Sequence, residues 1–344
     1  MDRLVMFHRD SLSCEPILRR VQNGELLCVS QCGDVTEPAP GNRVYVFHSG
    51  DNGETWSAPV SIWPEDGQAV YLTEVMVSGG EITVFLTLHN GSFVNWKCVM
   101  VRSRDNGYTW EAAGAPPFFP TYTFMRGMIE LQNGDQLIAY QHYPVSEAEN
   151  RRLLAENLKW RDADIDVVQN GVILSRDSGK TWEKCEGPDI PIKGETGRSW
   201  VWSEPTIAEI EPGHILMLLR VCTTGRLWES HSYDGGRTWT QATATDIPNP
   251  NNKPKLLRLP DGRIALIHTP NALCGFAGRH PLSIWISEDG AKTWAYRHVV
   301  TRFPGVYCYP DGIYEDGHIL FTIEYNRHEI LFVDHRIGDN ETLL

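Results

Sequence analysis

The chain has 344 residues, of which 41% are hydrophobic and 22% charged, and its formal net charge is −13. This composition is typical of a folded globular protein, and the negative charge argues against nucleic-acid or anionic-membrane partners, both of which require a basic surface. No run of about 18 apolar residues occurs, and the first ten residues lack the basic and apolar regions of a signal peptide. We therefore expect a cytoplasmic protein, or a secreted one if a leader has been removed.

Six copies of a strand, a short glycine turn and a second strand follow one another along the chain. They begin at residues 15, 73, 126, 204, 253 and 309. In these copies apolar residues alternate on both sides of a tight turn such as Asn-Gly, Asp-Gly or Pro-Gly, which is the pattern of a β-hairpin. Each copy therefore predicts one hairpin.

A turn motif close to Ser-x-Asp-x-Gly-x-Thr-Trp follows each of the first five hairpins, at residues 49–56, 103–110, 175–182, 232–239 and 287–294. In the fourth copy, Asp234 can accept hydrogen bonds from nearby backbone N–H groups, Gly236 can adopt a positive φ, and Trp239 can pack into the core. We expect each motif to pin a second hairpin. Ala291 replaces the glycine in the fifth copy, and we expect that turn to be strained or differently shaped.

The spacing of the turn motifs predicts the fold. Successive motifs are 54, 72, 57 and 55 residues apart, and four-stranded units of this length repeated six times are typical of a β-propeller. The sixth unit lacks the motif, but residues 329–337 offer a third strand and residues 3–9 a fourth, which would close the ring and remove open sheet edges. The sequence therefore predicts an all-β fold, a single six-bladed propeller domain over residues 1–344.

The long spacing in the third unit comes from an insertion at residues 146–160. Ser146 and Glu149 have the spacing of a capping box, and Leu153, Leu154 and Leu158 would share one face of a helix. We expect this helix to lie beside the mouth of the central channel. There it would cap a substrate pocket or contact a second subunit.

In a propeller, the starts of the first strands and the ends of the second strands meet on one face around the channel. A polar cluster buried at such a place needs partners or a function. The polar residues expected there include Glu15, Glu37, Glu74, Arg126, His142, Glu204, Arg220, Arg279, Tyr309, Asp311 and Arg327. His142 is most simply a structural histidine, whereas Trp200 and Trp202, close to Glu204, are candidates to stack on a sugar.

Cofactor and metal motifs do not occur in the sequence. The eight cysteines lie far apart with no CxxC pair, and neither HExxH nor an acidic calcium loop is present. We predict buried free thiols, no metal and no cofactor.

The five turn motifs resemble the Asp boxes of the sialidase superfamily, and the resemblance extends from about residue 15 to residue 327. Sialidases use three arginines for the substrate carboxylate, a tyrosine nucleophile paired with a glutamate, and an aspartate as the acid/base. By this resemblance, Tyr309 would be the nucleophile and Glu204 its partner, while Arg220 and Arg279 would be two of the three arginines.

Two positions depart from the family pattern. The loop in which the family places its acid offers Glu37, with Asp34 as a competitor, and Cys14-Glu15-Pro16 stands where sialidases carry Arg-Ile-Pro. Loss of one guanidinium weakens bidentate binding of a carboxylate, and Glu15 would repel an anionic group placed beside it. The resemblance therefore implies an exo-acting, retaining glycoside hydrolase for a carbohydrate, expected to be an acidic sugar, and it disfavours sialic acid itself.

Two other interpretations stay open. Paired glutamates, Glu204 with Glu15 or Glu74, would suit a neutral sugar such as arabinose, as in related arabinanases, and the missing arginine favours this possibility. A binding module without turnover would use the same polar ring to hold a glycan. All three interpretations predict a carbohydrate partner.

Overall fold

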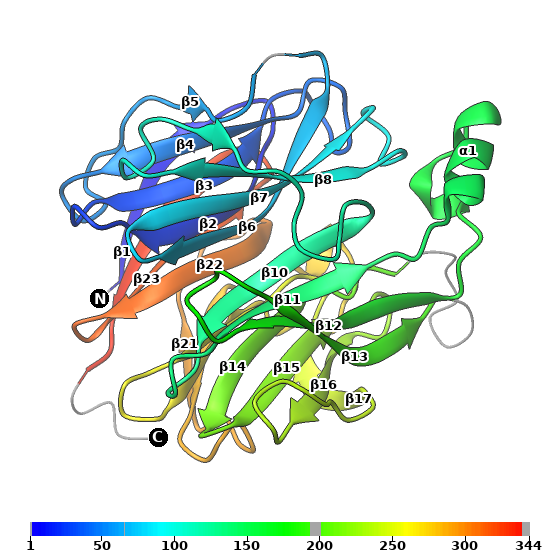
Figure 1. Ribbon diagram of the computed structural model, residues 1–344. Helices are drawn as coiled ribbons and strands as arrows, with labels where there is room; N and C mark the ends of the chain where they lie inside the picture. Colours follow the sequence, from blue (N-terminus) through cyan, green and yellow to red (C-terminus); the bar gives the residue numbers. More distant parts are fainter. Residues whose placement is uncertain (1, 65, 193–200, 339–344) are drawn as a thin grey trace.

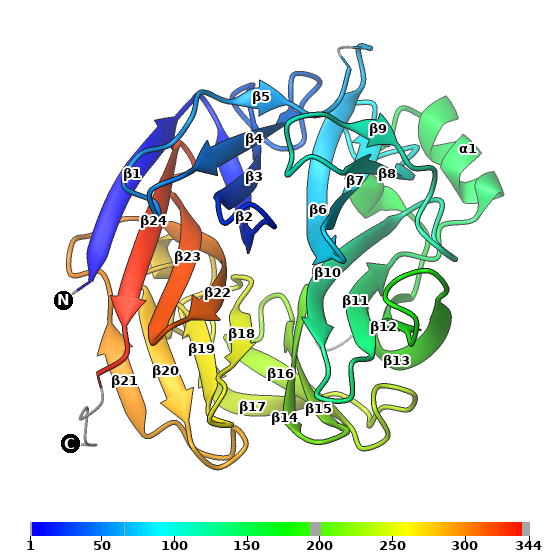
Figure 2. The same cartoon turned by 60° about the vertical axis from the view of Figure 1, so that its left-hand side comes forward.

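The computed structural model describes residues 2–64, 66–192 and 201–338. Their strands form six four-stranded antiparallel sheets arranged as the blades of one ring (Figure 1; Figure 2). In Figure 2 the first strands of the blades, such as β2, β6 and β10, face the centre of the ring. The predicted six-bladed β-propeller is confirmed. No helix in the described ranges is long and apolar enough to cross a membrane.

The first three blades follow the predicted order of two hairpins per unit. Blade 1 contains β2 (Ser13–Arg20), β3 (Leu26–Cys32), β4 (Arg43–Ser49) and β5 (Val60–Ser61). Blade 2 contains β6 (Ala69–Ser78), β7 (Glu81–His89), β8 (Lys97–Ser103) and β9 (Glu111–Ala112). Blade 3 contains β10 (Thr123–Glu130), β11 (Gln136–His142), β12 (Val167–Ser175) and β13 (Glu183–Pro191).

The last three blades repeat the arrangement. Blade 4 contains β14 (Pro205–Glu211), β15 (His214–Arg220), β16 (Arg226–Ser232) and β17 (Thr243–Pro248). Blade 5 contains β18 (Lys255–Arg258), β19 (Ile264–His268), β20 (Ser283–Ser287) and β21 (Tyr296–Val299). Blade 6 contains β22 (Tyr307–Glu315), β23 (His318–Tyr325), β24 (Glu329–Arg336) and, from the other end of the chain, β1 (Arg3–Arg9).

The N-terminal strand closes the ring as predicted. Strand β1 pairs antiparallel with β24, with Leu4 opposite Val333, and forms the outer edge of blade 6 (Figure 2). This pairing ties the two ends of the chain into one sheet, so every blade has four strands. The result is a closed ring that can hold side chains from different blades in fixed relative positions.

Apolar side chains fill the spaces between neighbouring blades. Val29 and Val46 of blade 1, for example, share one buried cluster with Val75 and Val84 of blade 2. All eight cysteines are free and seven of them are buried, which confirms the prediction of buried thiols for every cysteine except the exposed Cys274.

The five Asp-box turns lie at the end of the blades opposite the starts of the first strands. Ser49 pairs with Leu26 beside the β2–β3 turn, far along the hairpin from the start of β2. In the turn itself, the Asp51 carboxylate accepts hydrogen bonds from Thr55 N at 2.9 Å and Thr55 Oγ1 at 2.6 Å, and these bonds hold the pKa of Asp51 at about 2. The motif therefore belongs to the scaffold.

The fifth turn keeps this shape despite its alanine. Ala291 has a φ of +66°, in the left-handed region, and its N–H donates to Ser287 Oγ at 2.8 Å as the glycine N–H does in the other turns. Asp289 accepts the usual hydrogen bonds from Thr293. The expectation of strain agrees with the positive φ, because a Cβ disfavours this conformation, but the turn is not differently shaped.

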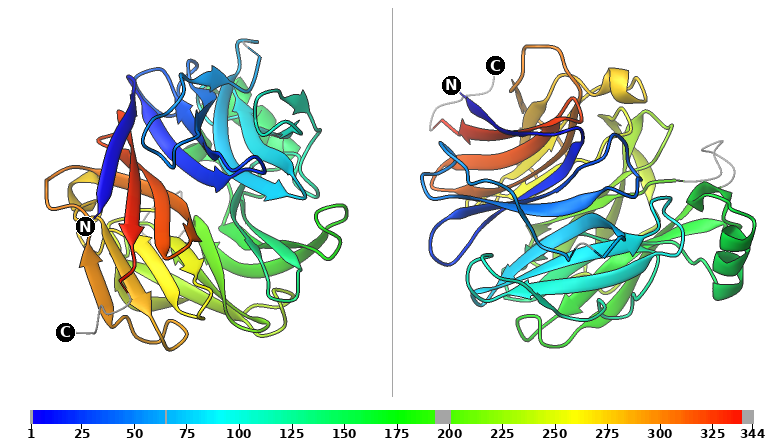
Figure 3. Two further views of the ribbon diagram at one scale, coloured as in Figure 1. Left: turned by 90° about the vertical axis from the view of Figure 1, so that its left-hand side faces the viewer. Right: turned by 90° about the horizontal axis from the view of Figure 1, so that it is seen from above.

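The insertion forms a shorter helix than predicted. Helix α1 spans Glu147–Ala155 and is followed by a 3-10 helix, η1, at Trp160–Asp162; α1 projects from the side of the ring (Figure 1; Figure 3). Ser146 Oγ accepts from Glu149 N at 3.1 Å as a cap, but the Glu149 carboxylate bonds Arg152 rather than the backbone of Ser146. The buried face is also narrower than predicted, because Leu154 is 44% exposed.

Candidate active site

Polar side chains from the first strands of different blades meet in the channel. Arg126 of blade 3 donates to Glu15 Oε2 of blade 1 at 2.5 Å and lies 3.7 Å from Glu204 Oε1 of blade 4. Tyr309 of blade 6 donates to the same oxygen of Glu204 at 3.0 Å. Contacts of this kind are possible only across the centre of the ring, so these four predicted residues form one buried cluster, called here the channel ring.

The Tyr309 hydroxyl lies between a carboxylate and a guanidinium group. Its hydroxyl donates to Glu204 Oε1 at 3.0 Å and accepts from Arg220 Nη1 at 2.8 Å, and Arg220 Nη1 also donates to Glu204 Oε2 at 2.5 Å. Burial raises the pKa of Tyr309, and this effect outweighs that of Arg220, which lowers it. The resting side chain is therefore a neutral phenol whose proton points at a carboxylate.

The backbone at two ring positions is strained. Glu15 and Tyr309 have φ values of +50° and +55°, and each stands directly before a proline in a β-bulge. A side chain disfavours the left-handed region, and bulges often redirect a side chain next to a functional site. Equivalent strain in blades 1 and 6 places both side chains in the channel ring.

The two carboxyls of the ring have opposite pKa shifts. Burial raises the pKa of Glu15 in spite of Arg126, and the nearby Glu204 raises it further. Burial acts the same way on Glu204, but Arg220 and Arg126 outweigh it and hold the pKa of Glu204 below its ordinary value. Carboxyls whose environments separate their pKa values in this way are typical of acid/base sites.

Two arginines are braced side by side next to Tyr309. Arg220 Nε donates to Asn251 Oδ1 and Arg279 Nη2 donates to Asn251 O, both at 2.7 Å. Each guanidinium carbon lies 5.9 Å from the centre of the Tyr309 ring. Asn251 thus holds two cationic groups, each close to the candidate nucleophile.

Glu37 and Arg327 form the rim of the cluster. Arg327 Nη2 donates to Glu37 Oε2 at 2.6 Å, and the Glu37 side chain remains 13% exposed. Asp34, the competing acid, accepts from Val35 N at 2.7 Å and Gly41 N at 3.0 Å. Asp34 therefore orders its own loop, whereas Glu37 faces the ring.

A second layer of charges lies beneath the ring. Glu74 and Asp311 both accept hydrogen bonds from Arg19, and Asp311 also accepts from Lys255 at 2.9 Å. Although burial acts in the opposite direction, Arg19 and Lys255 hold the pKa of Asp311 well below its ordinary value. The same two cations line a cavity of about 500 Å³. These predicted residues are brought together, but in a separate ion-paired group.

The remaining predicted residues lie around the ring. His142 bonds Thr123 Oγ1 at 2.7 Å, and burial lowers its pKa to about 4. The ring centre of Trp202 lies 5.8 Å from that of Phe124 and 6.3 Å from that of Trp160 in the insertion. The Phe124 ring in turn lies under the Arg126 guanidinium. The insertion therefore supports an aromatic wall beside the ring, while Trp200 falls outside the described residues.

Sequence reasoning missed several residues that complete the cluster. Tyr71 of blade 2 donates a hydrogen bond to Glu15, and Lys253 of blade 5 is a buried amine whose pKa is lowered by burial and by Arg126. Lys253 precedes a proline at the start of its unit, as Glu15 and Tyr309 do. That shared position is a signal that could have identified it. Tyr71 offers no comparable signal.

The sequence and the fold resemble known proteins. The model of the BNR repeat-like domain family matches residues 65–321. A comparison with curated proteins finds no match. The Hadza microbial sialidase Hz136 has a similar structure, with a TM-score of 0.73, 19% identity, and coverage of 98% of this chain and 67% of that one. A protein of unknown function from Dyadobacter fermentans has the same TM-score and identity over 98% of this chain and 99% of that one.

A sialidase from Trypanosoma rangeli, solved with 2,3-difluorosialic acid as a covalent intermediate, is also similar. The TM-score is 0.72 at 15% identity, and the match covers 96% of this chain but 59% of that one. At such identities the likeness establishes the propeller fold, and activity has to be argued from the site.

Proposed function

Because the chain belongs to the family of BNR repeat-like domains, we propose that it is a retaining exo-glycoside hydrolase that cleaves a terminal acidic sugar. The observation that carries this proposal is the position of Tyr309 Oη, 3.0 Å from Glu204 Oε1 and 2.8 Å from Arg220 Nη1. A tyrosine needs a base to remove its proton and a cation to stabilise the phenolate oxygen before it can attack carbon. Both groups are in place.

The first step follows from these contacts. As the Tyr309 oxygen forms a bond to the anomeric carbon, its proton passes to Glu204, and the bond to the leaving-group oxygen breaks. The lowered pKa of Glu204 keeps this carboxylate ionised and able to accept the proton. Arg220 stabilises the negative charge that develops on the phenolic oxygen. Water then releases the sugar, and the anomeric configuration is retained.

We assign the protonation of the leaving group to Glu37. Its side chain lies at the rim and is 13% exposed, so a glycosidic oxygen entering the mouth can reach it. The Glu15 side chain is 1% exposed and held by both Tyr71 and Arg126. Its raised pKa makes Glu15 the alternative acid, and substrates with good and poor leaving groups separate the two.

The paired arginines support an acidic substrate. Arg220 and Arg279, braced by Asn251, present two guanidinium groups next to Tyr309, and guanidinium is the side-chain group best suited to bind a carboxylate. An uncharged nucleophile such as tyrosine also avoids repulsion by an anionic sugar. With Glu15 in the ring, the carboxylate would rest on two arginines instead of three.

The contacts disfavour a mechanism with paired glutamates. The Arg126 guanidinium bridges Glu15 and Glu204, so it occupies the space where a sugar would need to lie between them. Glu74 is fully buried and bonded to Arg19 at 2.5 Å. A glycan-binding module without turnover would require neither the strained Tyr309 backbone nor its base.

Hydrolysis of aryl glycosides by Tyr309→Phe tests the proposal. The substrates are a panel that includes sialic acids, uronic acids and neutral sugars. Tyr307→Phe is the matched control because Tyr307 lies on the same strand and its hydroxyl interacts with Phe303 O and Thr301, neither of which belongs to the channel ring. We expect kcat of Tyr309→Phe to fall by about 10³-fold or more while the control keeps its activity. Full activity of Tyr309→Phe with an inactive Glu15→Gln would establish the paired-glutamate mechanism, and binding without product by the wild type would end the enzyme proposal.

A further inference from the structure

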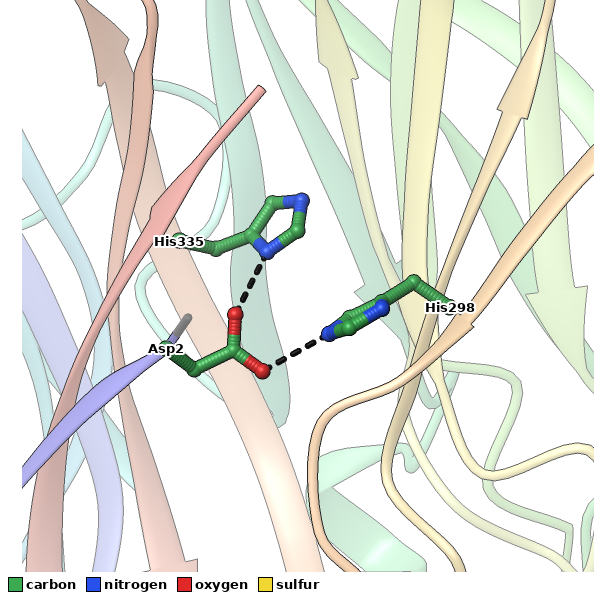
Figure 4. Close-up of side chains that lie close together, drawn as sticks. All are labelled: Asp2, His298 and His335. Carbon is green, nitrogen blue, oxygen red and sulfur yellow. Dashed lines mark hydrogen bonds and ion pairs between the residues drawn. The ribbon is translucent and has the colours of Figure 1, made fainter. Parts of the chain in front are cut away.

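Two histidines and an aspartate meet on the outer side of the ring (Figure 4). Asp2 Oδ1 lies 2.7 Å from His335 Nδ1, and Asp2 Oδ2 lies 2.7 Å from His298 Nε2. One nitrogen or oxygen atom of each residue lies within 4.8 Å of those of the other two. The three side chains point toward a common centre in Figure 4.

The three residues come from three different segments. Asp2 immediately precedes β1, His335 lies on β24 and His298 lies on β21. Strands β1 and β21 are the outer edges of blades 6 and 5, so this cluster is separate from the channel ring, which is built on the inner strands. It joins the strand that closes the propeller to the neighbouring blade.

The donor set has the chemistry of a transition-metal site. Imidazole nitrogen with one carboxylate oxygen suits Zn²⁺ and similar dications, whereas Ca²⁺ and Mg²⁺ prefer oxygen donors. The His335 and His298 nitrogens would release the hydrogen bonds to Asp2 and offer their lone pairs, each ring carrying its proton on the other nitrogen. The two Asp2–histidine separations of 2.7 Å would widen, and the two rings, whose centres are 4.8 Å apart, would turn so that all three donor atoms lie about 2 Å from one ion.

We propose that Asp2, His298 and His335 bind one divalent transition-metal ion of the Zn²⁺ class, which fastens the closing strand β1 to blade 5. The His335 side chain is 3% exposed and that of Asp2 is 11% exposed, so the ion would be largely shielded from solvent. The His298 side chain is 30% exposed. This open side leaves room for water as the fourth ligand. The position of the cluster on the edge strands, away from the channel ring, favours a role of the ion in stability.

Zinc binding by the whole chain tests the proposal. Chelator-treated protein is dialysed against Zn²⁺ at neutral pH, and bound metal is measured together with the melting temperature. We expect one tightly bound ion per chain and a rise in melting temperature, because a ligand that binds the folded state stabilises it. Mg²⁺ in place of Zn²⁺ should give no rise.

Matched histidine variants separate the site from incidental binding. His298→Ala should weaken zinc affinity at least 100-fold and abolish the rise in melting temperature. His318→Ala is the control, because His318 pairs with Asp334 on the same blade at 2.6 Å and no third metal-ligating residue completes that pair within the described part of the chain. Equal zinc binding by wild type and His298→Ala, or no binding by the wild type, would show that the three residues form only hydrogen bonds with one another and would overturn the proposal.

Discussion

Glu204→Gln and Glu15→Gln are the same substitution at two carboxyls of one network, yet we expect them to have different effects. Glu204 bonds Arg220 at 2.5 Å and lies 3.7 Å from Arg126, and these arginines hold its pKa low against the effect of burial. Burial instead raises the pKa of Glu15. Glu204 is therefore ionised at a pH where Glu15 still holds its proton.

The difference in charge sets the expected magnitudes. An amide at position 204 leaves the buried Arg220 without a counter-charge and leaves Arg126 with Glu15 alone, and removal of one partner from a buried ion pair costs about 3–5 kcal/mol of unfolding free energy. An amide at position 15 resembles the protonated acid, so below the ordinary pKa of 4.5 it should lower the unfolding free energy by only about 1 kcal/mol. Glu204→Gln also removes the acceptor for the Tyr309 proton, so kcat should fall by about 10³-fold, within the usual range for loss of a general base.

The pH dependence of stability has a definite sign for each carboxyl. Glu204 has a lowered pKa in the folded state, so it stabilises the protein at pH values above its ordinary pKa of 4.5. This stabilisation is lost as the pH falls through the folded-state pKa. Glu15, with a raised folded-state pKa, contributes stability that is complete below 4.5 and is lost as the pH rises through the folded-state pKa. The penalty of Glu204→Gln should therefore shrink in acid, and that of Glu15→Gln should shrink toward neutral pH.

Urea unfolding at pH 4, 5 and 7, followed by tryptophan fluorescence, measures both penalties. Each variant serves as the control for the other, because volume and burial change equally. A larger loss of stability for Glu15→Gln than for Glu204→Gln at pH 5 would refute the charge assignment. So would a penalty for Glu204→Gln that grows as the pH is lowered.

Three further predictions concern the acid, the substrate and the scaffold. Glu37→Gln should lower kcat/KM by about 10²–10⁴-fold for substrates with poor leaving groups and far less for nitrophenyl glycosides; a uniform loss would favour Glu15 as the acid. Arg279→Lys should raise KM for an acidic sugar about 10-fold and leave a neutral sugar unaffected, because lysine cannot reproduce the braced guanidinium; equal effects on both would contradict an acidic substrate. Ala291→Gly should stabilise the protein by up to about 1 kcal/mol in thermal unfolding, because relief of the left-handed strain exceeds the added chain entropy, and a clear loss of stability would contradict this.

The fold could be predicted because its signals are local and repeated. Each Asp-box turn needs only the groups within its own eight residues, as the hydrogen bonds that Thr55 donates to Asp51 illustrate. Five such turns at blade spacing are compatible with few architectures other than a propeller. The closing strand was predictable for the same reason, since the sixth unit lacked one strand. The length of α1 was not, because the helix ends at Ala155 and Asn157, with a φ of +53°, turns the chain out of the helix before the end of the predicted range.

The site was predictable only where topology places a residue. Glu15, Arg126, Glu204 and Tyr309 share the start of a first strand, so the propeller alone brings them together. Asn251 lies in a loop, and its own φ is +68°. Its hydrogen bonds to two arginines depend on this backbone conformation, which no sequence pattern predicts. The Asp2, His298 and His335 cluster joins residues far apart in the sequence, so no motif spacing points to it.

Glu15 places a carboxyl group in the channel ring where the sialidase pattern has an arginine, and neighbouring residues offset this difference in charge. Arg126 pairs directly with Glu15 at 2.5 Å, and the amine of Lys253 lies close enough to influence the pKa of Glu204. Arg126 is bound to Glu15 and bridges to Glu204. The other two arginines, Arg220 and Arg279, therefore keep their hydrogen bonds to Asn251 next to Tyr309. Under the proposed function, a carboxyl group at this position therefore does not abolish binding of an anion, because two guanidinium groups remain next to Tyr309. A substrate whose carboxylate is held by two guanidinium groups, with a neutral or hydrogen-bond-donating group facing Glu15, satisfies this arrangement better than one that needs all three.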